Sequence, residues 1–493
     1  MMKLSTPNSI WRTAAILGLL GILTRLPFQS QILSEHDAAN FALALTDFDV
    51  RLHQPHPPGT FVFLIFLGRL FNLFLHDANQ SLVSVSILAS GIAAAATFVL
   101  SASWFGRFVA WVSGLLMLSS PLVWFYGEVA LSYMLEYAWV LLLAIACFRL
   151  RLGDKIAFFV AAVMMGLAGG IRPNTPVFLF PLWSIAVALG MRESKYSWRQ
   201  LILALLLMAG GVALWAVPMV AMSGGVTAYW QAIGMWLDRH LEDVDNIWGM
   251  LNNAIALLKA LLFCVGLGFF PLLWVLGKER KSRLSRVKQD WRVQTLILWI
   301  APGAAYLIFI HFQRQGHTFT IMPAFVLLCG FAIGRCGQYL ARLHRPVGII
   351  IAAIVISCNS LFFLLGPGEL RTWTKIRQHD SFVKERVEAI RDRFPASQTV
   401  VLTRGSYARI LNFYLDDYQE TSLSHRLQTT PTVLPPQVRT LVLFDERILS
   451  RLAEDPGFAR LPLPSGETLR YISWNANQQV KVSKVSLDVH GDL

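Results

Sequence analysis

Two polar stretches near the N-terminus carry side chains suited to acid–base chemistry. Glu35, His36 and Asp37 follow an apolar segment, and His56 lies further along in the stretch Gln-Pro-His-Pro-Pro-Gly at 54–59. A carboxylate at the end of a membrane helix would lie at the boundary between water and lipid, where it can accept a proton from a hydroxyl. The prolines restrict φ and the glycine permits a sharp bend, so we expect this turn to hold His56 rigidly. The simpler alternatives are a helix N-cap for Asp37 and a solvated loop position for His56.

Arginine side chains that could bind a phosphate lie in two later loops. Arg172 stands before a proline, and Arg314 lies in a polar loop with His317. The planar guanidinium matches phosphate oxygens, although Arg172 suits equally well a cap on the carbonyls of the preceding helix. Arg25 and Arg69 are isolated in apolar segments, so we expect both to extend to the membrane interface and to take no part in a site.

Metal, disulfide and nucleotide sites have little support in the sequence. His311 and His317 raise the alternative of a zinc site, but they lack a third clear ligand. We therefore predict no metal and no organic cofactor, with a divalent metal kept as the alternative. The five cysteines lie in or at the ends of apolar stretches and no two form a CxxC pair, which argues against disulfides. Neither GxGxxG nor GxxxxGK[ST] follows a predicted strand of the C-terminal region.

The composition indicates what must position these side chains. Of the 493 residues 55% are hydrophobic and only 15% are charged, with a mean hydropathy of +0.51, whereas soluble domains carry about 25% charged residues. Residues 367–493 hold 15 of the 30 acidic and 17 of the 43 basic residues. We therefore predict a polytopic transmembrane region at 1–366 and a small extracytoplasmic α/β domain at 367–493. The net charge of +13 divides into +11 and +2, and Lys and Arg beside apolar segments mark cytoplasmic loops rather than a nucleic-acid site.

Eleven apolar segments approach the ~20 residues that a helix needs to cross a membrane. They lie near residues 13–29, 80–102, 108–125, 130–149, 155–171, 175–191, 201–222, 251–277, 293–311, 318–340 and 346–366. The first has no signal-peptide cleavage site, so we predict an uncleaved membrane helix there. The predicted fold class is a mostly α, polytopic helical membrane protein with about 11 transmembrane helices and a small C-terminal α/β domain.

The charges of the loops predict which side of the membrane each loop faces. The stretch 60–75 is apolar but short and carries Arg69, so it either crosses or lies in the outer interface. If it does not cross and the N-terminus is cytoplasmic, 19 Lys and Arg fall in the cytoplasm and 7 outside, whereas crossing gives 6 and 20. The positive-inside rule favours the first arrangement. We therefore predict a cytoplasmic N-terminus, an outer C-terminal domain, and long outer loops at 30–79 and 223–250.

The C-terminal region alternates between helical and strand patterns. The sequence predicts an amphipathic helix and a strand, then a helix and a second strand, and finally a short helix and a third strand. The predicted helices with bounds are 380–394 and 406–415, and the strands are 399–403, 439–444 and 469–473.

Taken together, the polar stretches resemble the C-type (GT-C) glycosyltransferase superfamily of integral membrane enzymes, which includes protein O-mannosyltransferases and the aminoarabinose transferase that acts on lipid A. The resemblance rests on Asp37 with His-Pro-Pro-Gly about twenty residues later, on Glu128 after the proline-aromatic helix end at 121–126, on Gly-Gly-Ile-Arg-Pro at 169–173, and on the polar loop of Arg314. Many members carry an acidic pair at the first site. Here Ala38 follows Asp37 and Glu35 precedes it, which leaves the part of a second carboxylate open.

The resemblance implies transfer of a single sugar from a polyprenyl-phosphate donor to a lipid, glycan or protein acceptor at the outer, periplasmic face of a bacterial inner membrane. It implies Asp37 as the general base. The residues implied to contact substrate or phosphate are Glu35, His56, Glu128, Arg172, Arg314 and His317. One alternative is a transporter or flippase of a lipid-linked sugar, although such proteins usually show related halves that this sequence lacks. Another is a non-catalytic member of the same fold.

Overall fold

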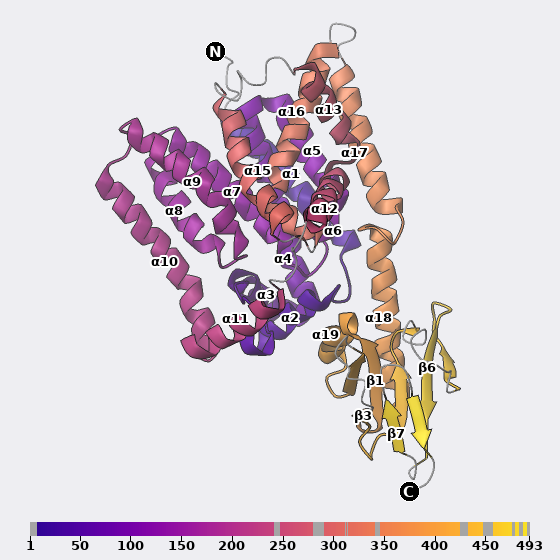
Figure 1. Cartoon of the computed structure of the whole chain (residues 1–493). Helices are drawn as coiled ribbons and strands as arrows, with labels where there is room; N and C mark the ends of the chain where they lie inside the picture. Colours follow the sequence, from indigo (N-terminus) through magenta and orange to yellow (C-terminus); the bar gives the residue numbers. More distant parts are fainter. Residues whose placement is uncertain are drawn as a thin grey trace. The chain divides into compact units, whose positions relative to one another are not determined.

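The computed structural model describes residues 7–240, 247–279, 290–310, 312, 314–340, 346–423, 432–446, 457–475, 479–482 and 487–490 (Figure 1). The chain divides into two compact units. The first comprises Met1–Gln29 and Ala44–Lys375, and the second comprises Ser30–Leu43 and Ile376–Leu493. This division falls nine residues after the predicted boundary at 366, and it groups the start of the predicted outer loop at 30–79 with the C-terminal residues.

Long apolar helices make up most of the first unit. Within the described ranges, nine helices or helix pairs are long and apolar enough to cross a membrane, which agrees with the predicted polytopic helical class. They are α1 (Pro7–Leu23) with η1 (Leu26–Phe28), α4 (Ala78–Phe105), α7 (Tyr133–Arg151), α9 (Asn174–Arg192), α10 (Trp198–Met222), α12 (Ile247–Val265) with η3 (Gly266–Gly268) and α13 (Phe269–Lys278), α15 (Trp291–Phe309), α16 (Met322–Leu340) and α17 (Val347–Leu365).

Two of the eleven predicted segments form shorter helices. The segment at 108–125 is divided into α5 (Arg107–Ser119) and α6 (Pro121–Tyr126), because Pro121 has no N–H to continue the hydrogen bonding of the first helix. The segment at 155–171 forms α8 (Lys155–Ala168), and the short stretch at 60–75 forms α3 (Val62–Leu75). A further helix, α11 (Val226–His240), lies in the second predicted outer loop.

Glycines allow α1 and α4 to pack backbone against backbone. A Cβ atom on Gly91 of α4 would lie 2.8 Å from the carbonyl oxygen of Gly18 in α1, and one on Gly21 would lie 3.0 Å from Cα of Gly91. Small residues at such interfaces let membrane helices approach closely, where van der Waals contact stabilises the pair. This packing fixes the helix that precedes the predicted outer loop at 30–79.

The second unit contains a mixed five-stranded sheet and a smaller three-stranded sheet. The larger has the order β2 (Gln419–Leu423), β1 (Thr399–Arg404), β4 (Thr440–Leu443), β6 (Thr468–Ser473) and β5 (Ala459–Pro462). Strand β1 runs parallel to β2 and β4, and β6 runs antiparallel to β4 and β5. The smaller sheet is antiparallel and has the order β3 (Thr432–Val433), β7 (Gln479–Val482) and β8 (Leu487–His490).

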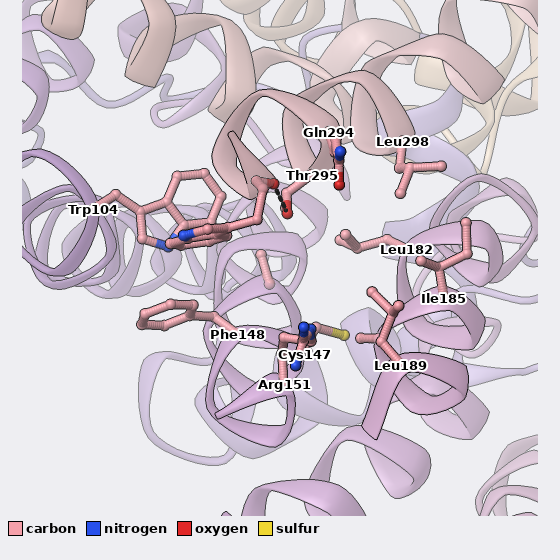
Figure 2. A pocket seen from close by; sticks show the side chains of 13 residues that line it. Trp104, Cys147, Phe148, Arg151, Leu182, Ile185, Leu189, Gln294, Thr295 and Leu298 are labelled. Carbon is pink, nitrogen blue, oxygen red and sulfur yellow. Dashed lines mark hydrogen bonds between the residues drawn. The ribbon is translucent and has the colours of Figure 1, made fainter. Parts of the chain in front are cut away.

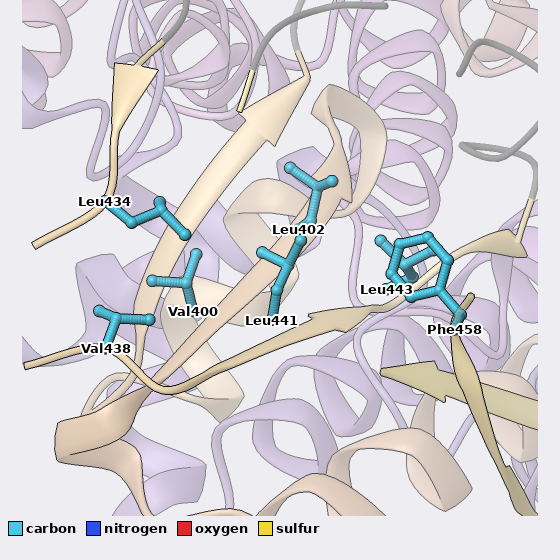
Figure 3. Close-up of a cluster of buried hydrophobic side chains, with 7 residues drawn as sticks. All are labelled: Val400, Leu402, Leu434, Val438, Leu441, Leu443 and Phe458. Atoms are coloured by element: carbon cyan, nitrogen blue, oxygen red, sulfur yellow. The ribbon is translucent and has the colours of Figure 1, made fainter. Parts of the chain in front are cut away.

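Buried aliphatic side chains form the core of this unit. All four residues of β4 are buried, as expected for a strand with neighbours on both sides. Figure 3 shows Leu441 and Leu443 of β4 with Val400 and Leu402 of β1 and with Phe458. Two predicted helices correspond to α18 (Trp373–Arg393) and α19 (Gly405–Tyr414), and the three predicted strands to β1, β4 and β6. The third predicted helix, between 444 and 469, falls mainly on 447–456, outside the described residues.

Candidate active site

His56 lies in a turn that is held by contacts on both sides. The N–H of Gly59 donates to the carbonyl of His56 at 3.0 Å, and the hydroxyl of Tyr229 in α11 donates to the carbonyl of Pro58 at 3.0 Å. Gly59 has φ +79°, and a Cβ atom there would lie 2.2 Å from Cγ2 of Val50. Only glycine fits both this conformation and this space. The Gln54–Pro55 and Pro57–Pro58 peptide bonds are cis.

Aromatic rings connect His56 to the predicted phosphate-binding residues of the first unit. The rings of His56 and Phe61 have centroids 4.8 Å apart. The guanidinium carbon of Arg172 lies 5.9 Å from the Phe61 centroid and 4.5 Å from that of Tyr133. The ring of Tyr133 lies 6.2 Å from that of His317. Three predicted site residues far apart in the sequence thus lie in one region.

Arg172 forms a buried ion pair with Glu136, which the sequence interpretation had not selected. Nε of Arg172 lies 3.2 Å from Oε2 of Glu136, and their side chains are 10% and 2% exposed. Nη1 of Arg172 donates to Oγ of Ser132 at 3.0 Å, and Thr175 donates to Oε1 of Glu136 at 2.6 Å. The guanidinium of Arg172 is therefore directed to a carboxylate on α7. Two opposite charges near membrane-helix ends are a sequence signal for such a pair.

The loop of Arg314 and His317 packs on two tyrosines. Arg314 precedes η5 (Gln315–Thr320) and is half-buried. The N–H of Gly316 donates to the hydroxyl of Tyr126 at 3.1 Å. A Cβ atom on Gly316 would meet the ring of Tyr133 at about 2.4 Å, so only glycine allows η5 to approach this ring. The turn therefore holds Gly316 and His317 beside Tyr133, the ring that Arg172 contacts.

Arg371 is a further cation in this region that the sequence analysis did not identify. Its guanidinium carbon lies 4.9 Å from the ring centroid of Tyr126 and 5.1 Å from that of Phe125. The residue lies between α17 and α18, where nothing in the sequence separates it from the many basic residues that follow. The group formed by His56, Arg172, Arg314, His317 and Arg371 is called the basic cluster below.

Glu128 is completely buried. Nε1 of Trp124 donates to its Oε1 at 2.6 Å. Burial raises the pKa of the Glu128 carboxyl well above its usual value, while the positive charge of Arg25 and the hydrogen bond from Trp124 offset part of this rise. That Glu128 contacts substrate stays a prediction, and Glu136 is the carboxylate that pairs with Arg172.

Arg25 and Arg69 were expected to extend to the membrane interface, but both donate hydrogen bonds to carbonyl groups of the protein. Arg25 is 0% exposed, its Nη2 donates to the carbonyl of Leu118 at 2.9 Å, and its guanidinium carbon lies 4.7 Å from the ring centroid of Trp124. The expectation for Arg25 is wrong, because a buried carboxylate and an aromatic face compensate its charge inside the protein. Arg69 donates to the carbonyls of Ala44 and Leu45 at 2.9 and 2.8 Å, at the end of α2 (His36–Thr46).

Asp37 and Glu35 belong to the second unit. Asp37 is the second residue of α2 and half-buried, so it is not the N-cap, a position that falls to Glu35. A carboxylate in the first helical turn is stabilised by the helix dipole. Asn40 of the same helix is buried and its Oδ1 accepts a hydrogen bond from Nε of Arg409 at 2.7 Å. The start of α2 is thereby fixed to α19.

The structure does not decide whether the protein binds a metal ion. In the ranges that the structure describes, no three His, Cys, Asp or Glu residues lie close enough to hold an ion. His311 and Gln313, and the acidic residues at 242, 243 and 245, lie outside those ranges. The expectation that no metal is bound therefore stays a prediction. All five cysteines are free, in agreement with the prediction of no disulfides.

The chain has a fold like that of solved C-type membrane glycosyltransferases, and it is a multi-pass membrane protein. Among solved structures it is similar to ArnT from Cupriavidus metallidurans in the apo state, with a TM-score of 0.55 and 12% identity, and to the same protein bound to undecaprenyl phosphate, with a TM-score of 0.53 and 11% identity. Each comparison covers 95% of this chain and 98% of ArnT.

An archaeal protein has the same fold. The oligosaccharyltransferase AglB from Archaeoglobus fulgidus, in complex with an inhibitory peptide and a dolichol-phosphate, has a TM-score of 0.51 and 11% identity, over 94% of this chain and 74% of AglB. No protein-family model and no curated protein sequence matches the chain. At such identities the likeness shows the fold.

Proposed function

We propose that this protein is a membrane glycosyltransferase that moves a single sugar from a polyprenyl-phosphate donor to an acceptor at the outer face of a bacterial inner membrane. The observation that carries the proposal is the match over nearly the full length of both chains to a structure that holds undecaprenyl phosphate. The extent of the match also favours a single sugar, because this chain covers 98% of ArnT but only 74% of the oligosaccharyltransferase.

The proposed reaction is a displacement at the anomeric carbon of the donor sugar. Asp37 accepts the proton of the acceptor hydroxyl while the hydroxyl oxygen forms a bond to the anomeric carbon. The bond between that carbon and the phosphate oxygen breaks, and its electron pair stays on the phosphate. The products are the glycosylated acceptor and the free polyprenyl phosphate, which remains in the membrane.

The basic cluster supplies the charge that this leaving group needs. Arg371 lies over the ring of Tyr126, and Arg314 is two residues from Gly316, whose N–H donates to the Tyr126 hydroxyl. We assign these two arginines to the donor phosphate, with His56 and His317 as further donors of hydrogen bonds. Preorganised cations stabilise the developing negative charge without reorganisation at the moment of reaction. Arg172 takes a different part, since its charge is already balanced by Glu136: it positions the rings of Phe61 and Tyr133.

A transfer assay in purified membranes tests the proposal. Labelled polyprenyl-phosphate sugars are added to membranes that contain the wild-type chain or the Asp37→Asn variant, and the label is followed into lipid, glycan and protein fractions. Transfer by the wild type and its loss in the variant are expected. Movement of intact labelled donor across the membrane without transfer would identify a flippase instead, and binding of donor without either process would identify a non-catalytic member of the fold.

A further inference from the structure

A pocket lies at one end of the membrane helices, away from the basic cluster. It is formed by the ends of α4, α7 and α9 and the beginning of α15. Figure 2 shows an aromatic wall with Trp104 and Phe148 on one side and an aliphatic wall of Leu182, Ile185 and Leu189 on the other. The empty space between them, its open part included, is about 500 Å³. At this end of the helices, the connecting loops are the basic ones that the sequence predicts to be cytoplasmic.

The aromatic wall contains a buried donor that lacks an acceptor. Trp104 stacks edge-on against Trp291, with ring centroids 5.6 Å apart, and Phe148 lies parallel to Trp291 at 5.3 Å. Trp104 is only 4% exposed, and among the described residues its indole N–H has no hydrogen-bond partner. An unpaired buried N–H is costly. A ligand that places an oxygen atom in this pocket would satisfy it.

The rim of the pocket carries an excess of positive charge. Arg151 lines the pocket and pairs with Glu193 at 2.6 Å, while Nζ of Lys195 pairs with the same carboxylate at 2.8 Å. One carboxylate thus serves two cations. An anionic group at the pocket mouth would supply the missing negative charge, as basic pockets between membrane helices do for lipid headgroups.

Exposed lining residues on apolar helices indicate that the pocket opens toward lipid rather than water. Ile185 on α9 and Trp291 on α15 are 39% and 41% exposed, although both helices are apolar enough to span the membrane. Tryptophan at this position is typical of the membrane interface. A water-soluble ligand would have to pass the acyl chains to enter, whereas a membrane lipid is already present there.

We propose that this pocket binds an anionic phospholipid, with one acyl chain between the two walls and the phosphate beside Arg151. The neighbouring segment 280–289 is a less suitable occupant, because five of its ten residues are Lys or Arg and only Leu284 and Val287 are apolar. That segment would bring positive charge to Arg151. A lipid phosphate brings negative charge and an apolar chain together.

Native mass spectrometry of the purified full-length chain tests this proposal. The protein is incubated with phosphatidylglycerol or phosphatidylcholine in detergent, and the retained lipid is counted. We expect phosphatidylglycerol to be retained about fivefold more than phosphatidylcholine, and Arg151→Gln to remove that preference. Arg107→Gln is the control, since Arg107 begins α5 and does not line the pocket. Equal retention of both lipids by the wild type would overturn the assignment of an anionic ligand.

Filling the pocket tests the position of the lipid. Ala186 lines the pocket from α9 and is 8% exposed, so Ala186→Phe should occupy the space of the acyl chain and abolish retention. Val177→Phe, on the same helix at a 65% exposed position, should leave it unchanged. If Ala186→Phe does not fold, Trp104→Phe serves instead, because it keeps an aromatic ring but removes the N–H. Wild-type retention in either folded pocket variant would place the lipid elsewhere and refute the proposal.

Discussion

Asp37 is the residue on which the proposed chemistry depends most directly. Asparagine has the same size and keeps much of the hydrogen bonding in the first turn of α2, but it cannot accept a proton from a hydroxyl. We expect Asp37→Asn to express and bind donor normally and to lose turnover by roughly 10²- to 10⁴-fold. Single-turnover transfer with a labelled donor measures this loss. Glu35→Gln is the matched control and should cost much less; the reverse order of effects would assign the base to Glu35.

Arg314 and Arg371 are expected to act on donor binding. A cation that pairs with the phosphate in both the ground state and the transition state contributes mainly uniform binding. Arg314→Ala and Arg371→Ala should therefore raise the apparent dissociation constant of the donor about tenfold or more, by analogy with other charge-assisted hydrogen bonds, with a smaller effect on turnover at saturation. Titration of donor against transfer rate measures both. An unchanged donor affinity in a folded variant would remove that arginine from the site.

Arg172 and Glu136 are expected to be tolerated in the interior only as a pair, because each charge compensates the other. Removal of one member of a buried ion pair leaves an uncompensated charge and typically costs roughly 3–5 kcal/mol. Arg172→Ala should therefore lower the folded yield, whereas the double variant Arg172→Met with Glu136→Met should recover much of it. Thermal inactivation in detergent compares the variants. If the single and double variants behaved alike, the two charges would not be coupled.

At the scale of elements, hydrogen bonds to Asp380 of α18 hold the segment before α2. Within the second unit, Oδ1 of Asp380 lies 2.9 Å from Oγ of Ser30, and Oδ2 accepts the N–H of Gln31 at 2.7 Å. The Ser30 hydroxyl also lies 2.6 Å from the carbonyl of Ile32. The Ser30 hydroxyl donates to the Asp380 carboxyl and so favours its ionised form, but burial has the larger and opposite effect. Burial raises the pKa of Asp380 to about 6.

This contact should weaken as pH rises. The folded chain holds the Asp380 proton more tightly than the unfolded chain, so the stabilisation is complete below the usual aspartate pKa of about 4 and is lost as pH rises through about 6. Hydrogen exchange of the amides at 30–43 should show more frequent opening at pH 7 than at pH 5, after correction for the intrinsic rate. Asp380→Asn should remove this difference. His379→Asn is the control, because His379 lies 3.0 Å from the Leu33 carbonyl in the same contact; a difference that disappears only in this variant would assign the effect to the histidine.

Hydrophobic patterns predicted the long helices and the strands β1, β4 and β6, because a buried apolar run or alternation leaves a clear signal. Strands β2 and β5 were missed, since Gln-Glu-Thr-Ser-Leu and Ala-Arg-Leu-Pro carry few apolar residues. The composition of such edge strands reflects solvent exposure and not pairing. Pairing over long sequence distances was harder to predict: opposite charges near helix ends are a signal for the pair of Arg172 and Glu136, but nothing in the sequence joins Arg371 to Tyr126. Site residues with short flanking motifs could be selected, but their partners required the fold.

At the scale of the whole molecule, the fold is shared with proteins that are only 11% to 12% identical in sequence. Membrane helices tolerate this divergence because lipid accepts any apolar side chain, and the buried faces need mainly small or complementary shapes. The similarity therefore lies in the order and length of the helices. Charged residues at the helix ends need specific partners, as the contacts of Arg25 and Arg172 show.

The side of the membrane on which the C-terminal domain lies follows from whether α3 crosses. With 14 residues, α3 is about 21 Å long, which is short of the ~30 Å hydrocarbon core. Its central Arg69 is bonded to the carbonyls at the end of α2, and Asp47 and Asp49 follow directly after that helix. A crossing α3 would draw these carboxylates toward the bilayer centre, where a charge is costly. It would also leave 20 basic residues outside and 6 inside, against the positive-inside rule.

We therefore expect a reporter that is active only in the cytoplasm to be silent when fused after Leu493. The same reporter inserted after Lys281, in the most basic loop of the chain, should be active and serves as the control for expression. The two fusions lie on opposite sides of three predicted membrane segments, so an odd number of crossings separates them in either orientation. An active C-terminal fusion with a silent insertion after Lys281 would mean that α3 crosses the membrane. Arg172, Arg314 and Arg371, which follow α3 in the chain, would then face the cytoplasm while His56 stayed outside, and a donor bound by these arginines would have to be a lipid of the inner leaflet.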